Sequence, residues 1–176
     1  MYKRQDLETL LGGAQAHLAL EWQPVGAPPD GRILELINKT NQFNVNGRRY
    51  GEAEWRQYAG EAGTGVLMAR YWDKFGELGK IGALSGRLDG AVFRIDTWVL
   101  SCRAFSRRIE HHMLKEVFER WQVDEVMVEF QPTERNGPAG ELFASLLDGP
   151  PPAGPFALTR ARFLARCPAL YHARPV

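Results

Sequence analysis

A thiol, several arginines and two histidines follow one another in one short stretch of the chain, Ser101-Cys-Arg-Ala-Phe-Ser-Arg-Arg-Ile-Glu-His-His112. An apolar run precedes this stretch, and an amphipathic pattern that predicts a helix begins at Ser106. The first N–H groups of a helix lack intrahelical partners and attract anions. We therefore predict a phosphate site at the helix start, with a capping hydroxyl and three cations as its ligands: Arg103, Ser106, Arg107 and Arg108. The alternative is an ordinary capped helix with a solvated basic first turn.

Cys102 and His111 are the candidates for catalysis within this stretch. A thiol near a helix N-terminus and cationic side chains has its thiolate favoured, and the thiolate is the form that attacks a carbonyl carbon and carries an acyl group. One of His111 and His112 could accept a proton from a thiol or hydroxyl, while the other points elsewhere, because successive helical residues are about 100° apart. The alternatives are a small buried thiol and two histidines used in packing or at the surface.

Polar residues elsewhere are suited to binding a substrate or a carrier group. The run 38–44 has little apolar area apart from Phe43, so its backbone and amides need partners. It is either a solvated loop after a helix or a loop that lines a substrate site, and its candidates are Asn41, Gln42 and Asn44. Asp73, in a predicted turn, is a candidate substrate-binding residue and a weak candidate base. Asn136 is either a turn residue or a residue that lines a binding channel.

The composition narrows the class of protein. The chain has 176 residues, 44% apolar and 24% charged, with a net charge of +1. We predict one globular domain over residues 14–176, after a linker-like helical lead over residues 1–13. The balanced charge and the lack of a long apolar stretch argue against nucleic-acid and membrane partners. Two cysteines without a CxxC pair or zinc-type spacing argue against disulfides and metal, so we expect a metal-free, cytoplasmic protein.

The hydrophobic periodicity places these candidates on a series of strands and helices. The expected strands are 17–25, 63–72, 80–88, 91–102 and 125–130, and the expected helices are 33–37, 52–59, 106–121 and 140–147. Glycine-containing turns make the three central strands an antiparallel row, while a helix between two strands implies a parallel pair. For the tail we predict a strand fragment, a helical turn from Thr159 and a strand over residues 170–173.

This order of elements resembles that of the GNAT acyltransferase fold, an α/β (α+β) fold, and implies a mixed central sheet of six to seven strands with four flanking helices. The sequence also resembles the C-terminal half of FkbH-like proteins, which are also called haloacid-dehalogenase (HAD) subfamily IIIC phosphatases. The segments that carry this second resemblance occur in the family's order: Asn38-Lys-Thr-Asn-Gln-Phe-Asn44, Arg48-Arg-Tyr50, Asp73-Lys-Phe-Gly76, Leu100-Ser-Cys-Arg103 and Pro132-Thr-Glu-Arg-Asn-Gly-Pro138.

The FkbH-like resemblance implies a domain that handles a short, glyceryl-like acyl thioester on the phosphopantetheine of an acyl carrier protein, in polyketide-type biosynthesis. A HAD-type phosphatase, in cis or in trans, would be a second partner. This chain has no Asp-x-Asp motif near its start, so we expect no phosphatase activity from it. The carrier group would be phosphopantetheine or coenzyme A, and the resemblance places Asn136 in the pantetheine channel.

One departure from the GNAT pattern leaves other functions open. The turn before the third GNAT helix normally reads Gln/Arg-x-x-Gly-x-Gly/Ala, so that backbone N–H groups approach a phosphate closely. Arg103 matches the first position, but Ser106 and Arg108 replace the two small residues. The alternatives are therefore a non-catalytic module that docks a carrier protein and a conventional N-acetyltransferase that uses acetyl-CoA.

Overall fold

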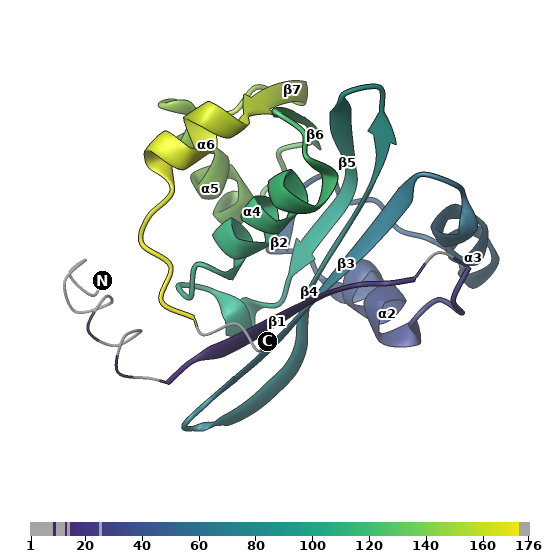
Figure 1. The fold of residues 1–176 in the computed structure, drawn as a ribbon, viewed down its shortest axis with the longest axis horizontal. Helices are drawn as coiled ribbons and strands as arrows, with labels where there is room; N and C mark the ends of the chain where they lie inside the picture. Colours follow the sequence, from purple (N-terminus) through teal and green to yellow (C-terminus); the bar gives the residue numbers. More distant parts are fainter. Residues whose placement is uncertain (1–8, 10–12, 14, 25, 173–176) are drawn as a thin grey trace.

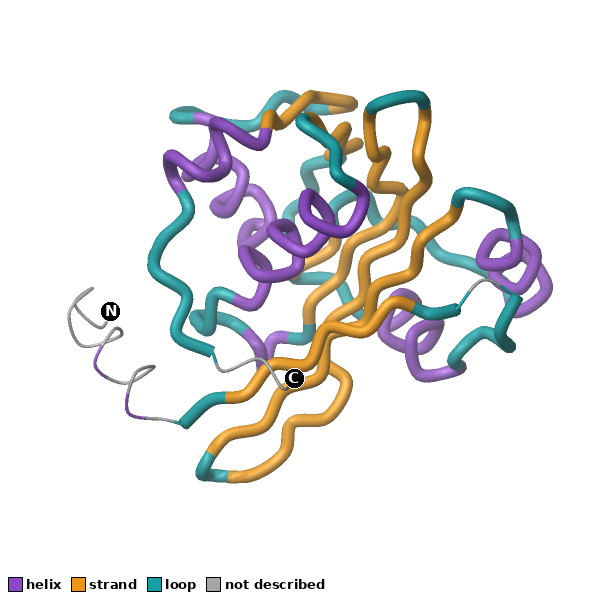
Figure 2. Tube along the Cα trace, in the orientation of Figure 1, coloured by secondary structure: helices purple, strands orange, loops and turns teal. Residues whose placement is uncertain are grey.

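The computed structural model describes residues 9, 13, 15–24 and 26–172, and it contains one mixed sheet with helices on both faces (Figures 1 and 2). The strands are β1 His17–Trp22, β2 Phe43–Asn44, β3 Thr64–Asp73, β4 Gly76–Asp89, β5 Val92–Leu100, β6 Glu125–Phe130 and β7 Gly154–Thr159. The helices are α2 Gly31–Lys39, α3 Glu52–Gly60, a 3-10 turn Cys102–Ala104, α4 Ile109–Trp121, α5 Gly137–Leu147 and α6 Arg160–Arg166. The sheet order is β1-β3-β4-β5-β6-β7, and β2 pairs with β5.

The pairing of the central strands follows the sequence prediction. β3, β4 and β5 are joined by hairpins and are antiparallel, with Asp73 opposite Gly76 and Asp89 opposite Val92 at the two turns. Gly90, in the second turn, has a φ of +60°, a conformation that glycine adopts at little cost. β5 and β6, which flank α4 in sequence, are parallel. The predicted fold class, with a mixed sheet of seven strands, is confirmed.

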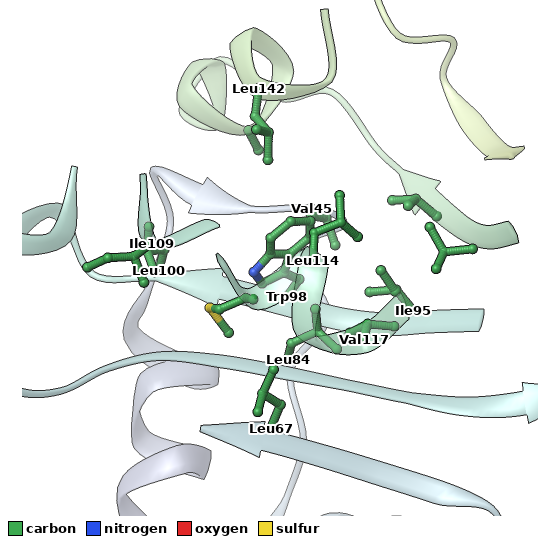
Figure 3. Close-up of a cluster of buried hydrophobic side chains, with 14 of the residues drawn as sticks. Val45, Leu67, Leu84, Ile95, Trp98, Leu100, Ile109, Leu114, Val117 and Leu142 are labelled. Atoms are coloured by element: carbon green, nitrogen blue, oxygen red, sulfur yellow. The ribbon is translucent and has the colours of Figure 1, made fainter. Parts of the chain in front are cut away.

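Two apolar cores hold the helices to the two faces of the sheet. The larger core lies against α4, α5 and α6, and the smaller core lies against α2 and α3 (Figure 1). Trp98, at the centre of the larger core, is fully buried and packs edge-on against Phe43 and Phe143, with ring centroids 5.4 and 6.0 Å apart. Figure 3 shows Trp98 beside Leu114 within this cluster. Each such fully buried side chain contributes about 1.5–3 kcal/mol to folding, so this core fixes the C-terminal end of β5.

Several sequence predictions need correction. α4 begins at Ile109, three residues later than predicted, and α6 is a fifth α-helix among the described residues where four were expected. α6 extends the predicted helical turn, because Thr159 caps it by accepting a hydrogen bond from the backbone N–H of Arg162. The predicted strand at 170–173 is absent from the described residues 170–172. Most of the predicted lead helix lies outside the described residues.

Candidate functional site

The parallel strands β5 and β6 pair over only part of their length. Val92 to Ile95 pair with Glu125 to Val128, and beyond this point the same edge of β5 pairs with β2. The backbone N–H of Val45 donates to the carbonyl of Trp98 (3.1 Å), and the N–H of Gln131 donates to the carbonyl of Val45 (2.9 Å). The segment 43–45 therefore fills the gap between the two strand ends and satisfies backbone groups that would otherwise lack partners.

Asn44 and Asn136, two of the predicted binding residues, hold this segment in place. The amide of Asn136 donates to the carbonyls of Asn44 (2.9 Å) and Gln131 (2.8 Å), and its side-chain oxygen accepts from the N–H of Thr133 (2.8 Å). The amide of Asn44 donates to the carbonyl of Thr40 (3.1 Å). Both asparagines are 2% exposed. They border a cavity of about 380 Å³, but their amides are already bonded to the chain, which favours the turn interpretation of Asn136.

The turn between β5 and α4 has an unusual backbone. Ser106 and Arg108 have φ values of +63° and +59°, in the left-handed region that favours glycine. These are the two positions at which the GNAT pattern has small residues, so the backbone keeps the glycine-type conformation although both residues carry side chains. Arg108 occupies the N-cap position of α4, and no capping hydrogen bond from this side chain to the helix start is found in the described part of the chain. The prediction that Ser106 caps the helix is therefore wrong.

The three arginines of the turn do not converge on one point. Arg107 donates to the carbonyl of Arg103 (2.8 Å), and its guanidinium lies over the ring of Tyr71 at 5.2 Å. Arg108 is 7% exposed, donates to the carbonyl of Ala169 (2.7 Å) and lies near the ring of a tail tyrosine. The guanidinium of Arg103 is exposed and has no hydrogen bond or ion pair among the described residues. Of the predicted cationic ligands, Arg103 is the one whose side chain stays available to an anion.

Cys102 opens into a cavity of about 320 Å³ that we call the thiol pocket. It is lined by α2, the loop after it and the turn after β5, through Arg32, Glu35, Leu36, Lys39, Thr40, Asn41, Gln42, Leu100, Ser101 and Cys102. Cys102 is exposed. The structure thus brings the predicted catalytic thiol together with Asn41 and Gln42, two of the predicted substrate residues. Asn41 also accepts a hydrogen bond from Arg49 (2.7 Å).

Charged residues of α2 form the far wall of the thiol pocket. Glu35 lies between Arg32 and Lys39, with contacts of 2.5 and 2.8 Å. Hydrogen bonds from Lys39 and Arg32 hold the pKa of the Glu35 carboxyl at about 2. Because one carboxylate faces two cations, this wall carries a net positive charge.

His111 lines a further cavity of about 330 Å³, which we call the imidazole pocket. It lies between the start of α4 and the start of α5, and its lining is Phe43, Leu100, Phe105, Ser106, Glu110, His111, Pro138, Glu141 and Leu142. Leu100 borders both this pocket and the thiol pocket. His111 is 9% exposed, and its Nδ1 atom makes no hydrogen bond among the described residues. A carboxylate oxygen of Glu110 lies 3.2 Å from this nitrogen, close enough to pair with it when the imidazole is protonated.

Asp73 lies apart from both pockets. It accepts hydrogen bonds from the Tyr71 hydroxyl and from the backbone N–H of Phe75, both at 2.8 Å, and so closes the β3–β4 hairpin. The cavity beside it, of about 390 Å³, is lined by hairpin residues. Burial raises the pKa of the Tyr71 hydroxyl. The predicted role of Asp73 in substrate binding is not supported by this position.

Sequence reasoning missed the acidic residues of the imidazole pocket. Glu110 is the neighbour of His111 in the first turn of α4, and this adjacency was an available signal. Glu141 and Phe43 come from distant segments, and no spacing in the sequence indicates that they meet His111. A buried pair was also missed: His112 and His172 lie with Nε2 and Nδ1 3.0 Å apart.

The structure also bears on metals and membranes. Among the described residues, no cluster of three or more His, Cys, Asp or Glu side chains is arranged to hold a metal ion. No helix in the described part of the chain has the length and apolar character needed to span a membrane.

The fold is that of the GNAT acyltransferases. A mutant of spermidine N-acetyltransferase SpeG from Vibrio cholerae matches with a TM-score of 0.54 and 12% identity, over 85% of this chain and 98% of that one. The aminoglycoside acetyltransferase AAC(6')-Ib in complex with coenzyme A and kanamycin matches with a TM-score of 0.52 and 14% identity, over 84% and 98% of the two chains. An aminoglycoside acetyltransferase from an uncultured soil metagenomic sample matches with a TM-score of 0.52 and 13% identity, over 73% and 86%.

These similarities establish the fold and leave the activity open, because the identities are low. No protein-family model matches the sequence, and no curated protein matches it. The resemblance to FkbH-like proteins stays a prediction.

Proposed function

We propose that the chain is an acyltransferase that moves a short acyl group from a pantetheine thioester, with acetyl-CoA as donor and an amine as acceptor in its first candidate reaction. The observation that carries the proposal is the end of β5, where Leu100 separates a pocket with an exposed thiol from a pocket with a buried imidazole. The GNAT fold supports it, since the structures named above are acetyltransferases.

We assign the role of general base to the imidazole of His111. In the reaction, the amine nitrogen attacks the thioester carbonyl carbon, the C–S bond breaks, and the thiol of coenzyme A leaves. The imidazole of His111, whose Nδ1 atom lies beside the carboxylate of Glu110, accepts the proton that the amine loses. The carboxylate of Glu110, 3.2 Å away, then pairs with the imidazolium.

We propose a smaller phosphate site for the donor than the three arginines that the sequence suggested. Arg103 is exposed and lies at the start of the turn, whereas Arg107 and Arg108 contact the chain itself. No lysine or arginine among the described residues lines the imidazole pocket to hold a phosphate. Arg103 is therefore the residue we assign to the phosphate-bearing end of the donor.

Release of free thiol from acetyl-CoA in the presence of an amine tests the proposal. We expect turnover that falls about 100-fold or more in His111→Gln, because a general base contributes 10²–10⁴ to the rate. His17→Gln is the matched control, since His17 stacks on Trp72 in β3 and borders neither pocket. Absence of turnover with every amine tried, or equal rates in the two variants, would refute the assignment.

Cys102 favours a second candidate reaction, transfer of a glyceryl-like group to or from the phosphopantetheine of an acyl carrier protein. The thiol would attack the donor thioester carbonyl, the C–S bond of the donor would break, and the pantetheine thiol would leave, which puts the acyl group on the sulfur of Cys102. The exposure of this thiol beside Asn41 and Gln42 supports this candidate. A HAD-type phosphatase remains a proposed partner in this reaction.

Intact-mass measurement after incubation with an acylated carrier protein tests the second candidate. We expect an adduct that Cys102→Ser abolishes and Cys167→Ser leaves unchanged. Cys167 is half-buried, and burial raises the pKa of its thiol. An adduct that survives Cys102→Ser would remove this thiol from the mechanism, and carrier binding without an adduct would indicate a docking module.

A further inference from the structure

The tail, which comprises residues 167–172 after α6, crosses to the turn between β5 and α4. These six residues form no helix or strand, and in Figure 1 they belong to the yellow stretch that leaves α6 and reaches the sheet. The carbonyl of Ala169 accepts a 2.7 Å hydrogen bond from Arg108, and the ring of Tyr171 lies 5.4 Å from the same guanidinium. Side-chain contacts therefore tie the tail to the turn, in place of the backbone ladder that would hold a strand.

Arg108 is the residue that these contacts cover. It is only 7% exposed, whereas Arg103, in the same turn, is exposed. A carbonyl oxygen that accepts from a guanidinium N–H occupies a direction from which a phosphate oxygen could bind. The tail thus takes a donor away from the turn, and its detachment would return Arg108 to a site where Arg103 is the exposed cation.

His172 anchors the tail in a buried cluster. It is 8% exposed, its Nδ1 lies 3.0 Å from Nε2 of His112, and its ring packs edge-on against Tyr71 at 5.7 Å. Its other nitrogen, Nε2, is buried and has no hydrogen-bond partner among the described residues. Protonation of His172 would place an N–H on both ring nitrogens, and the one on Nε2 would find no acceptor in the described chain. The docked tail therefore favours a neutral imidazole.

The charges around His172 add to this preference. The groups that face it are Arg107 and Arg108 of the turn, Glu110 and His112 of α4, and Tyr71 of β3, whose hydroxyl donates to Asp73. Burial lowers the pKa of the His172 imidazole to about 4, and the two arginines act in the same direction, whereas Glu110 opposes them. A detached tail would restore the ordinary pKa of about 6.5, so the ratio of detached to docked tail should rise at most about 10-fold for each pH unit below 6.5.

We propose that the tail is an autoinhibitory strap over the turn, and that its release in acid uncovers Arg108 as a second cationic ligand, beside Arg103, for a phosphate-bearing molecule. The carbonyl of Ala169 and a phosphate oxygen would compete for one guanidinium, so the affinity for the anion would rise with the fraction of detached tail. This inference rests on the proposed function only for the identity of the ligand, the phosphate-bearing end of the donor, because release of the tail does not depend on acyl transfer.

Backbone ¹⁵N relaxation of the whole chain tests the release without any ligand. We expect the heteronuclear NOE of the Ala169 and Tyr171 amides to fall as the pH drops from 7 to 4.5, while that of Val117 in α4 stays high. His172→Phe keeps a ring beside Tyr71 and removes the titrating group, so its tail should stay ordered over this range. Tail amides that stay rigid in the unmodified chain, or that loosen only together with α4, would overturn the proposal.

Titration with inorganic pyrophosphate at pH 7 tests the competition, at a single pH so that the charge of the probe stays constant. Tyr171→Ala removes the ring from the Arg108 guanidinium and should loosen the tail. An exposed cation–π contact corresponds to about a 2- to 5-fold change in an equilibrium constant, so this variant should bind pyrophosphate up to about 2- to 5-fold more tightly. Adding Arg108→Gln should abolish the gain. Leu164→Ala, which trims an exposed side chain of α6, is the control and should leave the affinity unchanged.

The outcomes separate this inference from the proposed function. Equal pyrophosphate affinity in Tyr171→Ala and the unmodified chain, or a gain that persists with Arg108→Gln, would overturn the strap, and acetyl-CoA turnover in the same protein would leave the acyltransferase proposal intact. A tail that loosens in acid, together with tighter pyrophosphate binding in Tyr171→Ala, supports the strap even where no acyl transfer is found. Because Tyr171 is 37% exposed, its variant tests the proposal even where the Arg108 variant folds poorly.

Discussion

The side-chain amide of Asn136 donates a 2.9 Å hydrogen bond to the backbone carbonyl of Asn44, across 92 positions of the chain. This contact fixes β2 in the gap where β5 and β6 stop pairing. The backbone groups at the edges of β5 and β6 beside this gap are therefore hydrogen-bonded within the chain. They are not open to an extended ligand that would bind by adding to a strand edge. The candidate site therefore consists of the thiol pocket and the imidazole pocket, and Phe43 of β2 lines the imidazole pocket.

Replacing Asn136 tests how much this contact stabilises the fold. Asn136→Ala removes three hydrogen bonds, one of them fully buried, and leaves the carbonyls of Asn44 and Gln131 without their donor. We expect the free energy of unfolding to fall by about 2–4 kcal/mol, measured by urea denaturation. Asn41→Ala is the matched control, since this asparagine is exposed and accepts one bond from Arg49; it should cost less than about 1 kcal/mol. Equal losses in the two variants would contradict the role given to Asn136.

Gly86 lies at a register shift in the β4–β5 pairing, directly against the backbone of β5. A Cβ atom at this position would lie 2.2 Å from the carbonyl oxygen of Arg94, a backbone atom that cannot move aside without breaking the pairing. Gly86→Ala should therefore destabilise the protein by about 2–3 kcal/mol or more, measured by thermal unfolding. Gly60→Ala, where a Cβ meets open space at the end of α3, should be neutral or slightly stabilising. A neutral Gly86→Ala would show that the two strands separate easily here.

Much of the fold followed from local patterns in the sequence. The row β3-β4-β5 was predictable because alternating apolar residues and Gly-containing turns specify hairpins without information from elsewhere in the chain. The parallel β5–β6 pair followed from the helix between them. α6 and the start of α4 were less predictable, because a short helix and a left-handed turn depend on tertiary contacts, such as the bond from Arg108 to Ala169.

The candidate site was predictable only in part. Cys102, Asn41 and Gln42 line one pocket, because the segments that follow β5 and α2 lie next to each other. We predicted that the three turn arginines share one phosphate site, but they do not converge. Arg108 is buried beneath the tail, about sixty positions later in the chain, where it contacts Ala169. Side-chain direction at a left-handed residue depends on such long-range packing, and helix periodicity does not describe it.

The buried pair of His112 and His172 predicts a pH-dependent stability. Burial lowers the pKa of His172 to about 4, with Arg107 and Arg108 acting in the same direction and Glu110 opposing them. At pH values below the ordinary histidine pKa of about 6.5, His172 is protonated in the unfolded chain but stays neutral in the folded chain. The free energy of unfolding should therefore fall as pH drops from about 6.5 to about 4, by no more than about 1.4 kcal/mol per pH unit from this group.

Urea denaturation at a series of pH values measures this contribution. His172→Phe keeps a ring beside Tyr71 but removes the titrating group, so the fall in stability between pH 6.5 and 4 should be shallower in this variant. His17→Gln should retain the slope of the unmodified chain. A slope in His172→Phe as steep as in the unmodified chain would assign the pH dependence to other groups.

Ser106 holds a left-handed conformation that glycine adopts at lower cost. Its φ is +63°, and no hydrogen bond of its hydroxyl is found in the described chain. Ser106→Gly should therefore raise the free energy of unfolding by about 0.4–1 kcal/mol, because it removes the steric strain of a Cβ atom in this conformation. Ser106→Ala is the matched control, because it removes the same hydroxyl but keeps the Cβ and should give no gain. Arg108→Gly should destabilise, although its φ is +59°, because it also removes the contact to Ala169. Thermal unfolding of the three variants measures these differences, and a gain in Ser106→Ala as large as in Ser106→Gly would show that backbone conformation is not the cause.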